Sequence, residues 1–185
     1  EARSGGLTTT SRKIIMTATV GDVIDHLAGI SAGSPIDLIR TKRPQTRTAA
    51  QESYRYLLEP ADAGAFPREE RLVVAFFVAA LHGDGPAAAF YAGLLGANAT
   101  PERVVTIRDE AERAAAKGPY GRYPEGPLSA EDVDGPVFAV SEEAENLFGE
   151  RLARGLEHAH LLVFHPRDAN GAALQRLLDA GWNND

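Results

Sequence analysis

An all-α protein with about six to eight helices is the architecture that this sequence indicates. Apolar residues recur at three- and four-residue spacing in most segments, which is the period of an amphipathic helix. Many of these segments begin with a capping side chain or a proline and end at a glycine. With 185 residues, of which 44% are hydrophobic, the chain is large enough to bury one core.

The first three helices are predicted from their start and stop signals. A short helix is expected over residues 23–28, ended by a glycine. Ser34 and Pro35 form a cap followed by proline at the first helical position, so a second short helix begins there. A third begins at Pro44 and ends before Pro60.

The middle of the chain contains the most apolar segment. Residues 72–81 are apolar at every position, and acidic residues precede them, so we expect a buried helix over residues 68–82 at the centre of the bundle. A helix of small residues follows over 87–95. Another begins at Thr100 and ends before Gly118.

The C-terminal part is predicted to contain a long loop and two helices. Residues 118–140 are rich in proline and glycine, and a loop of this length is uncommon unless it is functional or mobile. Ser141 begins one long helix that continues to Pro166. A last short helix is capped by Asp168 or Asn170.

Composition excludes several kinds of protein. The chain has no cysteine, so disulfides, thiolate catalysis and zinc–thiolate sites are excluded. A net charge of −7 argues against nucleic acid and anionic membranes as partners. No apolar run is long enough to span a membrane, so a cytoplasmic location is expected. Residues 1–15 are interpreted as a tag or unstructured tail, which leaves a single domain over 16–185.

Several short segments together resemble one known family. They are Asp22-Val23-Ile24, the segment from Arg43-Pro44 to Ala50-Gln51, Glu70-Arg71, His165-Pro166-Arg167-Asp168 and Ala180-Gly181-Trp182. In these segments the chain resembles the carboxymuconolactone decarboxylase superfamily, which includes the AhpD-like alkylhydroperoxidases, and in particular an uncharacterised branch of it. The resemblance covers most of the chain. It implies an AhpD-like helical bundle whose last helix, after residue 182, is missing here.

The resemblance also implies where the family's chemistry would be located. AhpD-like peroxidases have a Cys-x-x-Cys pair at the start of the helix after the long apolar one, with a histidine one turn later and a glutamate on the preceding helix. The corresponding positions in this chain are Asp84 and Ala87 for the cysteines, Tyr91 for the histidine and Glu70 for the glutamate. Without thiols the chain cannot be a peroxidase of this type acting alone.

Four residues are candidates for acid–base catalysis. His82 ends the apolar helix beside Asp84, and a His–Asp pair can move protons at neutral pH. Glu70 and Tyr91 are the further candidates that the resemblance implies. The alternative for His82 is a histidine that hydrogen-bonds the last carbonyl groups of its helix.

Two further residues are candidates for substrate binding. Arg47 could hold a carboxylate and Tyr54 could line a pocket, although aromatic residues at helical spacing more often belong to the core. Tyr120 and Tyr123 in the long loop could form a lid, an interface or part of a mobile loop.

Two other patterns favour ordinary structure. None of the five histidines has a metal-binding spacing such as H-E-x-x-H, so no metal site is predicted. Gly29-Ile30-Ser31-Ala32-Gly33 matches a nucleophile elbow, but that motif needs a preceding strand and a parallel sheet. A turn between two helices is the favoured interpretation.

Two functions fit these observations. The first is a non-redox accessory or binding subunit, which could work beside a cysteine-containing AhpD-like partner. The second is a cofactor-free decarboxylase or isomerase that acts on a small organic acid by acid–base catalysis. In either case no cofactor is expected. The central helix has several faces to cover and the resembled family oligomerises, so we expect a homo-oligomer, from a dimer to a hexamer.

Overall fold

The computed structural model describes residues 21–83 and 85–183, and this part of the chain is all-α, with nine α-helices, two 3-10 helices and no strands. The α-helices are α1 (Val23–Leu27), α2 (Pro35–Thr41), α3 (Pro44–Leu58), α4 (Arg68–Ala80), α5 (Pro86–Gly96), α6 (Pro101–Ala114), α7 (Glu142–Phe148), α8 (Glu150–Phe164) and α9 (Gly171–Asp179). The 3-10 helices are η1 (Pro127–Glu131) and η2 (Pro166–Asp168). The expected tail, residues 1–15, and the candidate Asp84 lie outside the described residues.

The predicted helix starts are confirmed at several caps. Ser34 caps α2 by accepting a hydrogen bond from the N–H of Asp37, and Thr100 caps α6 in the same way. Of the two candidate caps for the last helix, Asn170 takes that place, and its side chain accepts from the N–H of Ala173. The turn from α1 to α2 contains Gly29 with φ of 63°, a left-handed backbone that glycine adopts without strain.

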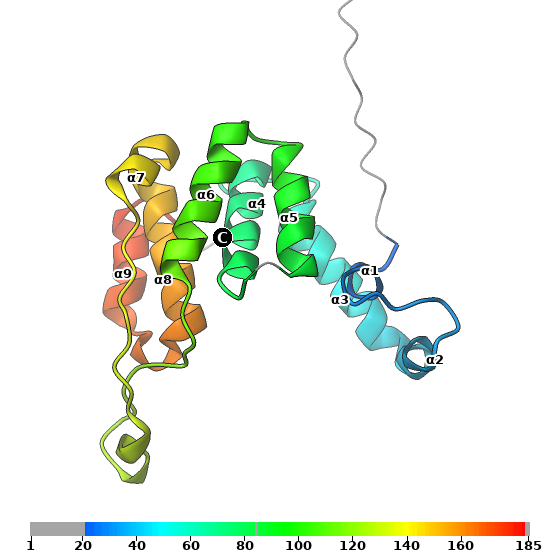
Figure 1. The fold of residues 1–185 in the computed structure, drawn as a ribbon, viewed down its shortest axis with the longest axis horizontal. Coiled ribbons are helices and arrows are strands. Elements are labelled where there is room, and N and C mark those ends of the chain that lie inside the picture. The colour runs from blue at the N-terminus through cyan, green and yellow to red at the C-terminus, as the bar shows by residue number, and fades with distance from the viewer. Residues whose placement is uncertain (1–20, 84, 184–185) are drawn as a thin grey trace, which may run out of the picture.

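The predicted position of the apolar helix is confirmed, because α4 lies at the centre of the core. Leu72, Val73, Phe76 and Phe77 on α4 are fully buried. They pack under α5, α6 and α8, and Figure 1 shows α4 behind α5 and α6 in the middle of the molecule. The opposite face of α4, which includes Val74, is only partly buried in a single copy of the chain.

The prediction of one long helix after Ser141 is wrong. The chain forms two helices there, α7 and α8, and Gly149 separates them with φ of 86°. A left-handed residue cannot continue a right-handed helix, so α8 takes a new direction from α7. This break contributes to the count of nine α-helices in residues 21–83 and 85–183, against the expected six to eight. The choice of helix for residues 161–164 is confirmed.

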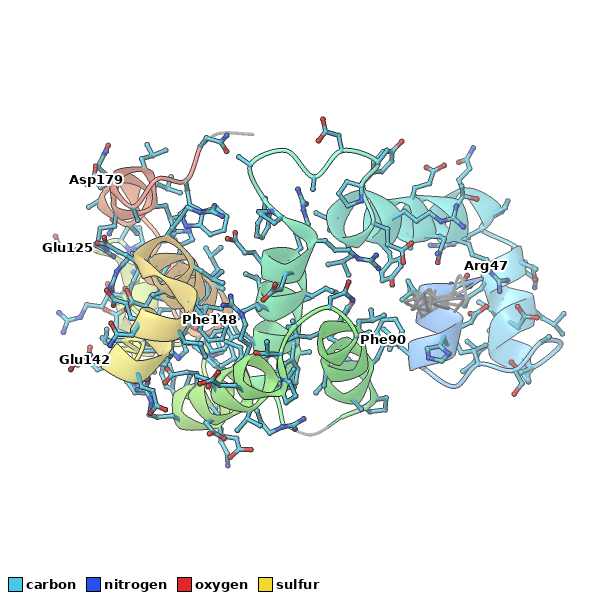
Figure 2. The ribbon with its side chains drawn as sticks, turned by 90° about the horizontal axis from the view of Figure 1, so that it is seen from above. Arg47, Phe90, Glu125, Glu142, Phe148 and Asp179 are labelled. Atoms are coloured by element: carbon cyan, nitrogen blue, oxygen red, sulfur yellow. The ribbon has the colours of Figure 1, made fainter. Side chains whose placement is uncertain are left out.

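The first three helices form an arm that projects from the bundle. α3 joins the arm to α4, and α1 contacts α5 (Figure 1). Viewed from above, the arm lies at the end of the molecule opposite to α7, α8 and α9 (Figure 2). No residue of α2 is buried.

The long loop between α6 and α7 extends away from the bundle and returns beside α8 (Figure 1). Its two sides meet in a short antiparallel bridge between Gly121 and Val133, with N–H to O distances of 2.8 and 3.3 Å. The loop is tied to α8 at each end. The N–H of Tyr120 donates to the carbonyl of Phe164 at 2.6 Å, and the N–H of Val140 donates to Glu157 at 3.1 Å.

Among the described residues, no helix combines the length and the apolar character that crossing a membrane would require.

Candidate functional site

Two of the predicted catalytic residues, Glu70 and His82, lie far apart in the described part of a single chain. Glu70 lies in the first turn of α4, whereas His82 follows its last residue, Ala80. Ala80 is ten positions after Glu70, which is about 15 Å along the helix at 1.5 Å per residue. Glu70 forms an ion pair with Arg151 of α8 rather than with any histidine.

His82 is exposed, and its ring makes no hydrogen bond among the described residues, whereas its backbone N–H donates to the carbonyl of Ala79 at 3.4 Å. Its ring lies 5.7 Å from that of Phe164 at the end of α8. Its predicted neighbour Asp84 is not described, so their pairing stays a prediction.

The two predicted tyrosines, on α3 and α5, share one aromatic neighbour. Tyr54 of α3 and Tyr91 of α5 both adjoin the ring of Phe90, at 6.3 and 5.2 Å between ring centroids. Burial raises the pKa of Tyr54 to about 12, and burial also raises the pKa of Tyr91. Both hydroxyls therefore stay protonated near neutral pH. Tyr54 is buried, as the core interpretation of helically spaced aromatics expects.

Arg47 is already occupied by carboxylates of its own chain. Its Nε donates to Asp22 at 2.7 Å and its Nη1 to Asp37 at 2.9 Å, and its Nη2 pairs with Asp25. Arg40 binds Asp22 and Asp25 as well. With three carboxylates around it, Arg47 in this conformation offers no free donor edge to a substrate.

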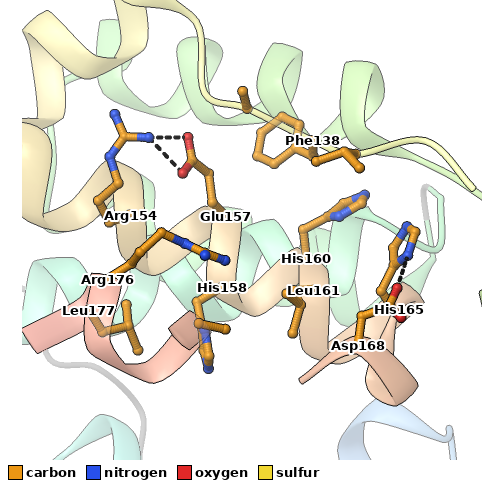
Figure 3. Close-up of a pocket in the computed structure, with 13 residues that line it drawn as sticks. Phe138, Arg154, Glu157, His158, His160, Leu161, His165, Asp168, Arg176 and Leu177 are labelled. Atoms are coloured by element: carbon orange, nitrogen blue, oxygen red, sulfur yellow. Dashed lines mark hydrogen bonds and ion pairs between the residues drawn. The ribbon is translucent and has the colours of Figure 1, made fainter. Parts of the chain in front are cut away.

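A pocket of about 460 Å³ lies elsewhere, between α8, α9 and the returning end of the long loop (Figure 3). We call it the α8–α9 pocket. It is lined by Val137, Phe138, Ala139, Arg154, Glu157, His158, His160, Leu161, His165, Asp168, Ala173, Arg176 and Leu177. Its size and its mixture of apolar walls with a few polar groups are those of a small-molecule site.

The two arginines of this pocket differ in their partners. Arg154 binds both oxygens of Glu157 at 2.6 Å and also pairs with Glu145, which raises the pKa of its guanidinium (Figure 3). Arg176 is exposed and extends from α9 toward α8, and no ion pair to it occurs among the described residues (Figure 3). Arg176 is therefore the cation of this pocket that remains open to a ligand.

The three pocket histidines have different surroundings. Burial, and then the charge of Arg176, lower the pKa of His158. His160 is 2% exposed, and its Nε2–H donates to the carbonyl of Ala114 at 3.0 Å. Burial lowers the pKa of His160, so that its neutral form is favoured.

His165, at the end of α8, is bound on both sides of its ring. Its Nδ1 lies 3.1 Å from Oδ2 of Asp168, and its Nε2 lies 2.9 Å from the carbonyl oxygen of Pro136 (Figure 3). The ring of Tyr120 packs against it at 5.2 Å. The loop residue Tyr120, one of the two lid candidates, thus packs against the histidine of the segment 165–168 that carries part of the family resemblance.

Sequence reasoning missed this pocket, although one signal for it was present. Arg154, His158, Leu161 and His165 recur every three or four residues, so they share one side of α8. A polar stripe of this kind usually indicates a solvated surface. The loop and α9 turn it into the wall of a pocket, and neither contact is local in sequence.

No group of three or more histidine, aspartate or glutamate side chains in the described part of the chain is arranged to hold a metal ion.

Comparison with protein-family models, with curated proteins and with solved structures gave no match to this chain.

Proposed function

We propose that the chain is a cysteine-free, AhpD-like member of the carboxymuconolactone decarboxylase superfamily and serves as a non-redox binding or accessory subunit. The resembling segments and an all-α fold around one apolar central helix support the family assignment. The absence of every thiol supports a role without redox chemistry of its own.

The α8–α9 pocket is where such a subunit binds its ligand, a small organic acid with an apolar body. The observation that carries this proposal is Arg176, which reaches into a pocket of 460 Å³ without an ion-pair partner. His158 beside it adds a second nitrogen donor, and Phe138, Leu161 and Leu177 provide apolar contact. A carboxylate bound by Arg176 would gain charge-assisted hydrogen bonds, and its apolar part would leave water.

Calorimetric titration of the protein with small aromatic and aliphatic carboxylates, each paired with its neutral amide, tests this role. The carboxylates are expected to bind more tightly than the amides. Arg176→Gln should remove that preference and weaken carboxylate binding by about tenfold or more, as expected for the loss of a hydrogen bond to a charged group. Arg43→Gln, at the start of α3 in the distant arm, is the matched control. Equal binding of acids and amides would contradict the proposal.

A cofactor-free decarboxylase or isomerase is the second candidate. The hydrogen-bonded pair of His165 and Asp168 at the edge of the same pocket favours it, because release of Nε2 from the carbonyl of Pro136 would let this histidine exchange protons with a bound acid. His82, Asp84, Glu70 and Tyr91 stay candidates only if a second copy of the chain brings them together. Turnover of a bound carboxylate that is lost in His165→Gln, with binding retained, would favour the enzyme over the binding subunit.

We further propose that the protein forms a homo-oligomer in the cytoplasm and can associate with a cysteine-bearing AhpD-like protein. The partly buried face of α4 supports the first association. Native purification followed by mass spectrometry and light scattering separates the possibilities. Stoichiometric recovery of a cysteine-bearing homologue would support the accessory role, and a homo-oligomer recovered alone would count against that partner.

A further inference from the structure

We propose that His165 is a proton-operated clasp, which holds one wall of the α8–α9 pocket against α8 when its ring is charged and loosens that wall when the ring is neutral. The wall is the segment of residues 136–139. The clasp is a property of the free protein. Its role in controlling access to the pocket rests on the proposed binding function.

The hydrogen bonds of His165 are those of a charged ring. Nε2 faces the carbonyl oxygen of Pro136 at 2.9 Å, and a carbonyl oxygen can only accept. Nδ1 faces Oδ2 of Asp168 at 3.1 Å. The other oxygen of Asp168 accepts the N–H of Arg122 at 3.2 Å, as expected of an ionised carboxylate. Both ring nitrogens can donate at once only in the imidazolium form.

Loss of one proton leaves one of these contacts without a donor. A neutral imidazole has a single N–H, so its second nitrogen presents a lone pair to an oxygen that is also an acceptor. Either Pro136 or Asp168 is then released from the ring. The contacts of the loop wall therefore depend on the protonation state of this one ring.

The clasp acts on both sides of the long loop. Pro136 directly precedes Val137 and Phe138, which line the pocket. Asp168 binds the backbone of Arg122 on the outgoing side of the loop, and the carboxylate lies so close to Gly121 that a Cβ there would stand 2.8 Å from Oδ1. One histidine therefore connects the outgoing chain, the returning chain and the end of α8.

Charged and titratable groups surround His165 on every element that packs against it. They are His160 on α8, Asp168 on η2, and Tyr120, Arg122 and Asp134 on the loop, while Arg154, Glu157 and His158 on α8 and Arg176 on α9 line the same pocket farther along. Asp134 pairs with Arg122 at 3.3 Å, so their charges largely offset each other. His160, 6.1 Å away between ring centroids, is buried in its neutral form. Asp168 is thus the charge that acts most directly on the His165 ring.

Amide hydrogen exchange, expressed as protection factors at pH 6 and pH 8, tests the clasp in the unliganded protein. The amides of Arg122 and Val140 report on it, because each donates from the loop to the body of the protein. Their protection is expected to fall about tenfold from pH 6 to pH 8, the effect of losing one charge-assisted hydrogen bond. The amide of Ile107, in the core of α6, should keep its protection.

Two histidine variants make the test specific. In His165→Gln both loop amides should be weakly protected at either pH, because glutamine does not titrate. His158→Gln, which changes a pocket histidine outside the clasp, should respond to pH as the parent does. Equal protection at the two pH values in the parent, or a full response in His165→Gln, would overturn the proposal.

Nitrogen chemical shifts of the His165 ring provide a second measurement, which needs no variant. Both ring nitrogens should be protonated where the loop amides are protected, and one should be deprotonated where that protection is lost. A neutral ring at pH 6 with a fully protected loop would overturn the clasp. Because neither measurement uses a ligand, failure of the carboxylate titrations would affect the binding function alone.

Discussion

Gly155 on α8 shows how little space a single position can leave. A Cβ at this residue would lie 2.5 Å from the indole of Trp182, and that indole is fixed by a hydrogen bond from its Nε1–H to the carbonyl of Arg151 at 2.7 Å. The guanidinium of Arg151 lies over the same ring at 4.6 Å. The indole of Trp182 can therefore occupy this place only because residue 155 has no side chain.

Gly155→Ala is expected to lower the free energy of unfolding by about 1–3 kcal/mol, because the indole must move to admit a methyl group. Gly93→Ala, in the middle of α5 with nothing within 4 Å of its Cβ, should instead raise it by about 0.5–1 kcal/mol. Urea unfolding followed by the fluorescence of Trp182, the single tryptophan, measures both. Equal effects of the two substitutions would show that the indole gives way freely.

His160 makes the stability of the protein depend on pH. Burial lowers the pKa of His160 in the folded state, so the unfolded chain takes up this proton at a higher pH than the folded chain does. The contribution of neutral, buried His160 to the free energy of unfolding is therefore retained above the ordinary histidine pKa of about 6.5, and it is lost as the pH falls below that value. His160→Gln should lose less stability than the parent between pH 7.5 and pH 5.5.

Urea midpoints at the two pH values measure this difference. At pH 7.5 the same variant should be less stable than the parent by about 1–3 kcal/mol if the buried carbonyl of Ala114 loses its donor. His26→Gln, at an exposed ring on α1, should show the same acid sensitivity as the parent. Unchanged acid sensitivity in His160→Gln would mean that other groups dominate the dependence.

At the scale of the elements, the arm of α1, α2 and α3 is held together by charge more than by apolar contact. α2 has no buried residue, and its Asp37 joins Asp22 and Asp25 around Arg47. Burial opposes the charged form of Asp22, but hydrogen bonds from the N–H of Asp25 and from Arg47 and Arg40 lower its pKa on balance. Because the pKa of Asp22 is lower in the folded state, its ion pairs stabilise the arm fully at a pH above the unfolded-state pKa. This stabilisation is lost as the pH falls through the folded-state pKa.

Arg47→Met should release α1 and α2 while the bundle stays folded, because three carboxylates would then face one another with only Arg40 between them. Amide exchange in α1 and α2 is expected to become about tenfold faster or more, and exchange in α4 should not change. Arg55→Met, on the same helix but outside this ion cluster, is the matched control. If both variants exchange alike, the arm is held by something other than Arg47.

Sequence reasoning located most elements correctly because their signals are local. Ser34 and Thr100 are capping residues that are each followed directly by a proline. The starts of α2 and α6 can therefore be predicted from the sequence alone. Gly149 was missed because the apolar stripe continues from Ala144 to Leu152 across it, which predicts one helix. Only the direction in which α8 must pack selects the left-handed backbone at that glycine.

At the scale of the whole molecule, the apolar residues on α2 are the clearest sign of association with a second copy. Ile36, Leu38 and Ile39 are 56%, 57% and 63% exposed, at the far end of the arm from the pocket. A cluster of exposed aliphatic side chains of this kind is typical of an interface.

Ile39→Lys is expected to shift the protein from its oligomer to smaller species, because a charged side chain cannot be buried at an apolar contact without a partner. Light scattering after size-exclusion chromatography at several concentrations measures the shift. Leu128→Lys, which changes a similarly exposed leucine in η1, should leave the mass unchanged. A monomeric parent protein would contradict the expectation directly.

The candidate site could not be predicted as well as the helices, because it depends on how distant segments meet. The sequence-derived residues follow the order of the resembled family, yet Glu70 and His82 lie toward opposite ends of α4 and Arg47 lies in the arm. The α8–α9 pocket joins segments near residues 137, 158 and 176. The spacing of residues within one helix does not indicate which distant segments will pack against it.

The bridge between Gly121 and Val133 has a consequence for engineering. Because the backbone closes on itself there, residues 122–132 leave the body and return to almost the same point. A closed excursion of this kind is a natural place to graft foreign sequence, since the anchoring residues are already spaced as the ends of a hairpin. A fluorescent domain or an affinity peptide could thus be inserted near Glu125 without changing either terminus of the chain.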